Sequence, residues 1–544
     1  MTTVAAPATT LDPAMPDGPG RAVTWLAVRQ IRRGGLIVVA LTAGMTALVA
    51  ATYASVMADP AATGSLQALT ANPAIRTLFG EPLALDTAGG FTVWRVGTVI
   101  AVLLAVWAIL STTRITRGEE DAGRWDVLLA GRIALRTAVT RHVVAVMTAA
   151  LTAGIAVAGV LLLAGTQPAG ALIHGAGIGL LGLYFTLVAA LAAQVFPARA
   201  PATGTAVAVL GAGLLMRMIG DGVTELGWLR WLSPFGLLSL SGPYHHNRIL
   251  PLLILLAATM VAGMIAFLAA GHRDVRGGLV AVNPGHRPRL RLLTSVETFA
   301  VRRLLRPLTG WAIGIGAYFL LIGATAVSIT DFLTDNPALA GEAAKAGFAE
   351  LGAVEGFTAT LFALLALPVG GFTAVRTAAF IAAETDRRLT LLSAQPVSRM
   401  RMLGAELMVT MGGAAVLVTL AGLATWSAVA AVGGGLDLLA ALHGAWNTLP
   451  IVLLSLAAAA LAAGWVPRTA ALLGALPATG GFLLLVIAES INAPVWVRDV
   501  SPFAHLAPVP LQSVDWPATT TMLVIAAATT VVAAVGYQRR DLRS

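Results

Sequence analysis

The chain contains no cysteine and a single lysine, and few of its residues carry a charge. Its 544 residues are 57% hydrophobic and only 11% charged. Without cysteine, neither a disulfide framework nor a thiolate metal site can form. A chain of this length has too few charged residues to form the polar surface that a water-soluble protein needs. In a lipid bilayer such a polar surface is not required. The composition therefore indicates an integral membrane protein.

The scarcity of lysine also bears on ATP. A phosphate-binding loop ends in Gly-Lys-Ser or Gly-Lys-Thr, because its lysine reaches the terminal phosphate while backbone N–H groups hold the others. Lys345 stands in Glu-Ala-Ala-Lys-Ala-Gly, which is not such a loop. We therefore expect no nucleotide site, no enzymatic activity, no metal and no cofactor in this chain. Proton-coupled carriers need ionisable groups at membrane depth. The few charged residues in the predicted spans lie near span ends, where we expect interfacial groups: Arg217, Glu406, Asp437 and Glu489.

Apolar runs long enough to cross a bilayer, about 20 residues each, recur along the whole chain. They are rich in small residues, which let helix backbones approach closely in lipid. We predict an all-α membrane protein with about 12 transmembrane helices, six in each half. The first six spans are 36–56, 92–113, 140–165, 173–195, 203–220 and 249–271. The second six are 309–330, 356–378, 403–433, 447–465, 469–489 and 518–537.

Four unusual local patterns occur twice in the same order, about 270 residues apart, which indicates a duplicated unit. The pairs begin at Ala27 and Ala300, Asp121 and Glu384, Trp228 and Trp496, and Arg273 and Arg540. We therefore predict two parallel six-helix repeats. The expected segments are a disordered tail (1–20), a first repeat (21–278), a cytosolic linker (279–295) and a second repeat (296–544).

Most arginines fall on one side of these spans, and the positive-inside rule then places both termini in the cytosol. The net charge of +9 fits a cytosolic face that meets anionic membrane lipid, so we expect no nucleic-acid partner. The first 20 residues have no basic segment before an apolar one, so they do not resemble a cleaved signal peptide.

An acidic loop follows the second span of each half. In both copies carboxylates come first, then arginine, then a pair of leucines. We expect each loop to form a short amphipathic helix with its acids in the first turn, at the positive end of the helix dipole. Such a helix either anchors the loop at the membrane surface or docks a cytosolic partner. Two copies at equivalent positions favour docking. The acids are expected in water, where they contribute little to stability.

Other patterns fit the same topology. Arginines at helical spacing precede the first and seventh spans. This pattern is typical of elbow helices, which lie in the membrane plane and anchor the chain there. The arginines are Arg29, Arg32, Arg33, Arg302, Arg303 and Arg306. The aromatic-rich stretches 221–247 and 491–516 fit either re-entrant hairpins or interfacial aromatic belts. The pair His245-His246, without a neighbouring acid, is more typical of solvated histidines than of a metal site.

Several of these motifs resemble one known family. The acidic loop ending in Leu-Leu-Ala or Leu-Leu-Ser, Pro-Val-Ser-Arg at 396–399, Leu-Ser-Pro-Phe at 232–235 and Arg-Arg-Asp-Leu at 539–542 look like actinobacterial permeases that export polyketide antibiotics and other drugs. Those permeases belong to the ABC-2 type of ATP-binding-cassette transporters. The resemblance covers nearly the whole chain. It implies a bacterial plasma-membrane permease for hydrophobic small molecules, with a coupling helix after the second span of each repeat.

The resemblance also implies a partner. A separate ATPase subunit would bind ATP and Mg and dock as a dimer, so that two copies serve one fused chain. The residues implied in coupling are Glu119, Glu120, Asp121 and Arg124 in the first repeat and Glu384, Arg387 and Arg388 in the second. The fusion departs from the commoner plan of two six-span chains. The first repeat also reads Ile133-Ala-Leu-Arg in place of Pro-Val-Ser-Arg, which leaves open whether the two docking sites are equivalent.

Three alternatives remain. A major-facilitator drug transporter also has six plus six spans, but its loop after the second span normally reads Gly-x-x-x-Asp-Arg-x-Gly-Arg-Arg, from which Gly118-Glu-Glu-Asp-Ala-Gly-Arg departs. An ABC exporter of lipid is the second. A membrane-embedded enzyme, the third, would need a cluster of acids or histidines at a span end.

Overall fold

The computed structural model describes residues 18–57, 76–77, 79–131, 133–280, 292–335, 337, 353–385, 389, 392, 395–490 and 493–540. In these ranges all regular secondary structure is helical, as predicted. Twelve helical segments there are long and apolar enough to cross a membrane, which confirms the predicted number. By internal contacts the chain divides into two compact units, of which the first ends at Pro284 and the second begins at Gly285.

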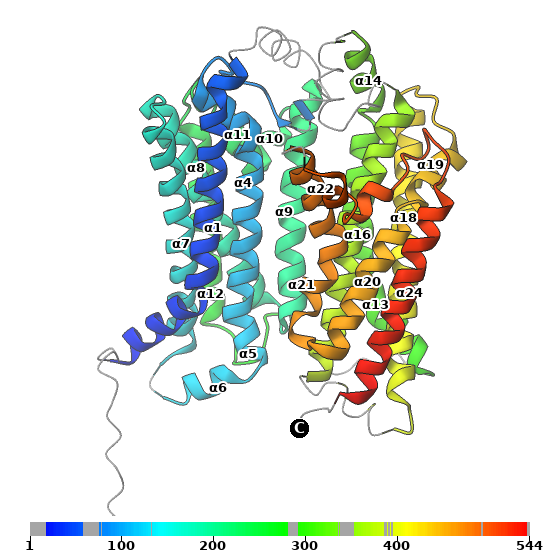
Figure 1. The fold of residues 1–544 in the computed structure, drawn as a ribbon. Helices are drawn as coiled ribbons and strands as arrows, with labels where there is room; N and C mark the ends of the chain where they lie inside the picture. Colours follow the sequence, from blue (N-terminus) through cyan, green and yellow to red (C-terminus); the bar gives the residue numbers. More distant parts are fainter. Residues whose placement is uncertain are drawn as a thin grey trace, which may run out of the picture. The chain divides into compact units, whose positions relative to one another are not determined.

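The first unit is built from six long helices joined by short ones (Figure 1). The second long helix continues through a π-helical turn into α5, so Ala88–Asp121 is one helical segment. The elements are α1 (Pro19–Met57), α4 (Ala88–Thr113), α5 (Glu119–Asp121), α6 (Arg124–Leu129), α7 (Leu135–Leu163), α8 (Pro168–Val195), α9 (Arg199–Gly222), α10 (Leu229–Leu232), α11 (Pro234–Leu240) and α12 (Leu250–Ala270).

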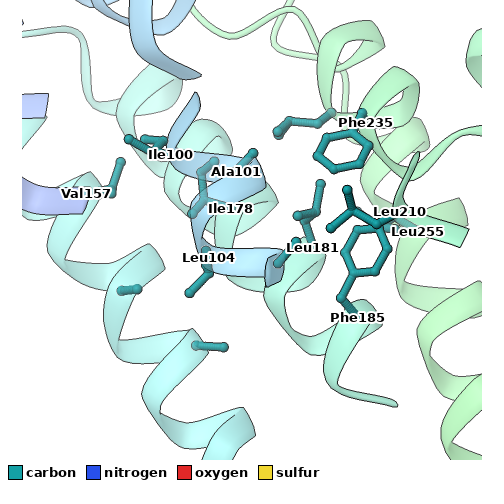
Figure 2. Packing of buried hydrophobic residues seen from close by; sticks show 14 of the residues in the cluster. Ile100, Ala101, Leu104, Val157, Ile178, Leu181, Phe185, Leu210, Phe235 and Leu255 are labelled. Carbon is teal, nitrogen blue, oxygen red and sulfur yellow. The ribbon is translucent and has the colours of Figure 1, made fainter. Parts of the chain in front are cut away.

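Helix α8 lies at the centre of the first unit, packed against α4, α7, α9 and α12. It is the most buried of the unit's long helices, with 61% of its most apolar stretch buried. Figure 2 shows Ile178, Leu181 and Phe185 of α8 among Leu104 of α4 and Phe235 of α11, and all five side chains are buried. Small residues let the neighbouring backbones come this close.

A tyrosine wedge closes one end of this core. The ring of Tyr244 lies so close to Gly89 of α4 and Gly170 of α8 that a Cβ at either glycine would come within 2.4 Å of a ring carbon. The Thr166 hydroxyl donates to the carbonyl of Leu161, so the Tyr244 hydroxyl donates to Thr166, 2.8 Å away. Burial raises the pKa of that phenol, which keeps the donor protonated. Glycine is therefore required on both helices for this contact.

The second unit repeats the plan with more interruptions. Its fifth span, Pro467–Val486, is broken by a π-helical turn that contains Pro477, because proline removes a backbone donor and clashes with the preceding turn. Its elements are α13 (Val296–Gly323), α14 (Ala326–Asp335), α16 (Val354–Thr385), α18 (Arg399–Ala431), α19 (Leu438–Trp446), α20 (Leu449–Trp465), α21 (Ala470–Ala475), α22 (Gly481–Ser490), α23 (Val495–Arg498) and α24 (Trp516–Arg539).

The Ser-Pro-Phe motif makes the same contact in both units. The Ser233 hydroxyl donates to the Gly213 carbonyl at 2.6 Å and accepts from the Gly236 N–H. Ser501 donates to the Gly481 carbonyl at 2.8 Å and accepts from a backbone N–H two residues on. Each serine thus begins a short helix and holds it against a long one. The matching contacts support the predicted duplication.

The described aromatic residues of the stretches 221–247 and 491–516 divide by type. Trp228 and Trp496 are exposed, whereas Phe235 and Phe503 are buried. Exposed tryptophans fit an interfacial belt, and the buried phenylalanines pack the short helices of the two Ser-Pro-Phe motifs onto the long ones. Both interpretations of these stretches therefore keep some support.

We expect Gly170→Ala to lower the thermal unfolding temperature of the purified protein, because its Cβ would overlap the Tyr244 ring and overpacking costs about 1–3 kcal/mol. The control is Gly159→Ala on α7, where a Cβ meets no atom within 4 Å. That change should be neutral or stabilising, by about 0.5–1 kcal/mol. Equal unfolding temperatures for the two variants would refute the role of the tyrosine wedge.

Candidate functional site: the arginine-rich end

The predicted coupling acids lie at one end of the first unit, where α4 and α12 finish and α7 and α9 begin; we call it the arginine-rich end. Figure 1 shows α5 and α6 beyond the end of α4. Glu119, Glu120 and Asp121 form α5, the last turn of the Ala88–Asp121 segment. The prediction that they begin a separate amphipathic helix is therefore wrong. They occupy a helix C-terminus, where the dipole disfavours negative charge.

Arginines compensate the most buried of these acids. Glu120 is completely buried, which also corrects the expectation that the coupling acids lie in water. Its carboxylate accepts from Nη1 and Nη2 of Arg273 at 2.6 and 2.8 Å and from the backbone N–H of Arg276 at 2.5 Å. Arg117, one turn earlier on the same helix, lies 3.1 Å from it. A buried carboxylate is tolerable when it is paired and hydrogen-bonded in this way.

The same arginines join three chain segments. Arg117 donates to the carbonyl of Ala193 at the end of α8 and to that of Gly277 in the segment after α12. Arg273 also donates to the Gln194 amide oxygen at 2.7 Å. We call Arg117, Glu120, Gln194 and Arg273 the first-unit network. It ties together the ends of α4, α8 and α12.

Asp121 and Glu119 have different roles. The Asp121 carboxylate accepts from the backbone N–H of Arg199 at 2.8 Å, at the N-terminus of α9, where a negative charge is favourable. Glu119 accepts from two nitrogens of Arg124 at 2.5 and 2.7 Å. The guanidinium of Arg124 is largely exposed. The Glu119–Arg124 pair therefore reaches solvent, whereas the carboxylate of Glu120 does not.

Helix α6 is the short amphipathic helix that the sequence predicts, although it begins three residues after the acids. Trp125 is buried among residues of α7, α8 and α12, with its ring centroid 5.4 Å from that of His142. Asp126 pairs with Arg276, next to the first-unit network. On the other face Val127 is 82% exposed. The helix is thus fixed on one side and presents an apolar side chain on the other.

The second unit has a corresponding cluster. Glu384, at the end of α16, pairs with Arg540 and accepts from the Tyr537 hydroxyl at 2.7 Å. Arg540 also donates to the carbonyl of Ala463 at the end of α20. We call Glu384, Tyr537 and Arg540 the second-unit network. In both units, then, an acid at the end of the second long helix is held by an arginine just after the last long helix, which is α12 in the first unit and α24 in the second. Arg387 and Arg388 lie outside the described residues.

The start of α18 differs from its counterpart α7. In the second unit Ser398 of Pro-Val-Ser-Arg caps α18 by accepting from the backbone N–H of Arg401. Ala134, in the corresponding Ile133-Ala-Leu-Arg segment, has no side chain that could cap α7. The sequence difference between the two repeats therefore changes how the third long helix of each unit begins.

Two charged residues expected at the interface are instead buried in ion pairs. Glu406 of α18 lies 2.5 Å from a nitrogen of Arg376 and 3.4 Å from one of Arg303. Arg217 of α9 lies 2.6 Å from Asp221. The sequence could have indicated the second pair, because arginine and aspartate four residues apart on a helix face each other.

The predicted elbow arginines begin the first long helix of each unit. Each segment is continuous with its span, and Figure 1 shows the first turns of α1 running at an angle to the rest. Most of these side chains are exposed: Arg29, Arg32, Arg33, Arg302 and Arg306. Arg303 is the exception, half-buried near Glu406 and 5.7 Å from the Phe380 ring. The first turn of α13 also pairs with α18 through Glu297 and Arg401, 2.7 Å apart.

In the described part of the chain, twelve helical segments long and apolar enough to cross a membrane define a multi-pass membrane protein. A family model described as the C-terminal domain of multidrug efflux system permease Rv1217c matches residues 23–270 and 293–538. The multidrug efflux system permease protein Rv1217c of Mycobacterium tuberculosis (strain ATCC 25618 / H37Rv) is 31% identical over 485 residues, which cover 88% of this chain and 86% of that protein. The chain belongs to this family of multidrug efflux permeases. It is a multi-pass protein of the bacterial plasma membrane.

We expect Glu120→Gln to destabilise the protein by about 3–5 kcal/mol, because it leaves two buried arginines without their carboxylate. Asp126→Asn is the matched control, since its pair with Arg276 is exposed and such pairs contribute less than about 1 kcal/mol. Thermal or denaturant unfolding of the purified protein measures both. If the two variants unfold alike, the first-unit network does not hold the helix ends together.

Proposed function

We propose that this chain is the membrane subunit of an ABC-2 type exporter, which moves amphipathic drugs or polyketide-like antibiotics out of the cell. In this proposal a separate ATPase subunit binds ATP and Mg, and two copies serve one chain, one beneath each repeat. Both termini and the arginine-rich end face the cytosol. Membership of the multidrug efflux permease family supports the transport role.

Helix α6 is the observation that carries the proposal. A coupling element must be fixed to the transmembrane helices and must also expose a surface to the partner. Trp125 and the Asp126–Arg276 pair supply the first property, and Val127 supplies the second. An isolated exposed valine needs no explanation, but one on the exposed face of a helix held by a buried tryptophan is suited to enter a groove on a partner.

The networks explain how movement of α6 would reach the membrane. Asp126 pairs with Arg276, whose backbone N–H is bonded to Glu120. Glu120 is bound in turn to Arg273 beyond the end of α12. In this proposal a push on α6 acts on the ends of α4, α8 and α12 through this chain of contacts.

We expect the purified chain to hydrolyse no ATP, and ATP-dependent export of an amphipathic dye from proteoliposomes to appear only with the ATPase subunit. Val127→Asp should then lower export by about tenfold, because a charge on the exposed face of α6 would cost about 1.4 kcal/mol or more of docking free energy, while leaving thermal stability unchanged. The measurements are dye export and co-purification of the ATPase.

The control for that variant is Val280→Asp in the segment after α12, where the side chain is also exposed at the arginine-rich end. It should export normally. ATP turnover by the isolated chain, freed of contaminants, would contradict the permease role. Normal export by Val127→Asp would remove α6 from the coupling surface.

The proposed topology makes its own prediction. The chain has no natural cysteine, so single cysteines report one position each. Cysteines at Arg136 and Arg399 should react with a membrane-impermeant maleimide only from the cytosolic side, and those at Arg230 and Arg498 only from outside. Opposite accessibility within either pair would show that the repeats are inverted rather than parallel.

A further inference from the structure

The first long helix of each unit contacts the third near the beginning of both helices, but the polar contact differs between the units. In the second unit Glu297 of α13 accepts from two nitrogens of Arg401 of α18, at 2.7 and 3.2 Å. In the first unit Arg141 of α7 donates through Nη1 to the hydroxyl of Thr24 of α1 at 3.2 Å. Thr24 and Glu297 stand at equivalent positions, three residues before the alanine that begins the first repeated pattern. The first unit therefore has a hydroxyl where the second has a carboxylate.

Arg141 has no carboxylate partner in the described part of the chain. The Thr24 hydroxyl donates to the Gly20 carbonyl at 3.1 Å, so it serves Arg141 only as an uncharged acceptor. Arg141 Nη2 lies 3.5 Å from the point where a Cβ on Gly20 would lie, and the side chain is exposed. The described ion pairs of the first unit use other arginines: Arg117, Arg124, Arg217, Arg230, Arg273 and Arg276. The positive charge of Arg141 is thus accessible and lacks a counter-charge there.

Further positive charge lies on the exposed face of α1. Arg21, Trp25, Val28 and Arg32 follow one another at steps of three or four residues and are all exposed, so they form one row on the helix. The guanidinium of Arg29 lies 5.0 Å from the Trp25 ring centroid. Neither α1 nor α7 contains an aspartate or a glutamate. The counter-charge for this contact must therefore come from outside the two helices.

An exposed apolar row begins beside Arg141 on α7. Val144, Leu151 and Ile155 are 48%, 43% and 71% exposed. With Thr148 they continue from Arg141 at steps of three or four residues, along one side of the helix. At 1.5 Å per residue the row extends about 21 Å from Arg141, which exceeds half of the roughly 30 Å hydrocarbon core of a bilayer. A ligand that matches both parts carries a negative group next to a long apolar chain.

We propose that an anionic phospholipid binds the first unit between α1 and α7. Its phosphate accepts from Arg141 and takes the place that the carboxylate of Glu297 has in the second unit. The acyl chain lies along the apolar row on α7. The nearby charges of Arg21 and Arg32 favour an anionic headgroup over a zwitterionic one. The lipid supplies the counter-charge that neither helix contains, and it stabilises the contact between them.

The test titrates the purified full-length chain in detergent with dioleoyl phosphatidylglycerol or dioleoyl phosphatidylcholine, and native mass spectrometry follows the lipid-bound forms. We expect the first phosphatidylglycerol to bind at least tenfold more tightly than the first phosphatidylcholine. Arg141→Gln should weaken phosphatidylglycerol binding by about tenfold, because it removes a hydrogen bond between charged groups. Arg401→Gln is the matched control in the second unit, since its guanidinium already pairs with Glu297, and it should leave that binding unchanged.

A second variant tests the equivalence of lipid phosphate and carboxylate. Thr24→Glu gives the first unit the acid that the second unit has, without removing an arginine. Its carboxylate should pair with Arg141 and weaken phosphatidylglycerol binding by about tenfold. Added phosphatidylglycerol should raise the unfolding temperature of the unmodified chain but not that of Thr24→Glu. Gel filtration checks that both variants are folded, and a folded Arg141→Gln or Thr24→Glu chain with unchanged phosphatidylglycerol affinity would overturn the proposal.

Other occupants of this surface give different results. If an acid outside the described residues, such as Asp17, neutralises Arg141, or if the second unit covers the row on α7, the two lipids will bind the unmodified chain alike and the proposal fails. If glycerophosphoglycerol, the headgroup without acyl chains, raises the unfolding temperature as much as phosphatidylglycerol does, the site binds free phosphate esters and the lipid is refuted. Either failure leaves the proposed ATP-driven export intact, because that proposal uses neither Thr24 nor Arg141.

Discussion

The structure depends on one type of interaction, which occurs in both units. A buried carboxylate at the end of the unit's second long helix is held by an arginine that lies just after the unit's last long helix. Glu120 with Arg273 and Glu384 with Arg540 are the two cases. A negative charge at a helix C-terminus is opposed by the dipole, and burial removes its hydration. The cost is offset only while the arginine stays in place. The arrangement therefore fixes helix ends that are far apart in the sequence.

This dependence explains why the sequence predicted some features and missed others. The spans were predictable because apolar length is a local property, and α6 was predictable because Trp125 and the leucine pair follow acids and arginine. The burial of Glu120 was not, because its partner Arg273 is 153 residues away. A carboxylate in an acidic loop normally lies in water. Both the acidic loop and the motif Arg-Asp-x-Arg, which begins at Arg273 and at Arg540, occur once in each half. Only this shared repetition could have suggested that the loop and the motif contact each other.

The interior of the bundles was the least predictable part. The break in the fifth span of the second unit follows from Pro477 and could be anticipated. A cavity in the first unit could not, because it depends on how His174 and Arg217, from α8 and α9, are placed relative to α11. Hydropathy assigned Arg217 to a span end and said nothing of its partners. The packing of helices that are not adjacent in the sequence decides which charged residues find an ion-pair partner.

The two halves share the carboxylate–arginine networks at their helix ends and differ elsewhere. The buried ion pairs within the helices lie at different places, Glu406 of α18 beside Arg376 and Arg303 in the second unit and Asp221 of α9 beside Arg217 and Arg230 in the first. The proposed coupling to two copies of one ATPase would require similar surfaces on both halves, so the networks that hold those surfaces would be under a common constraint. The helix interiors carry no such constraint. In the proposed exporter, the two halves would therefore be free to differ in their helix interiors while each receives the same mechanical input from one ATPase copy.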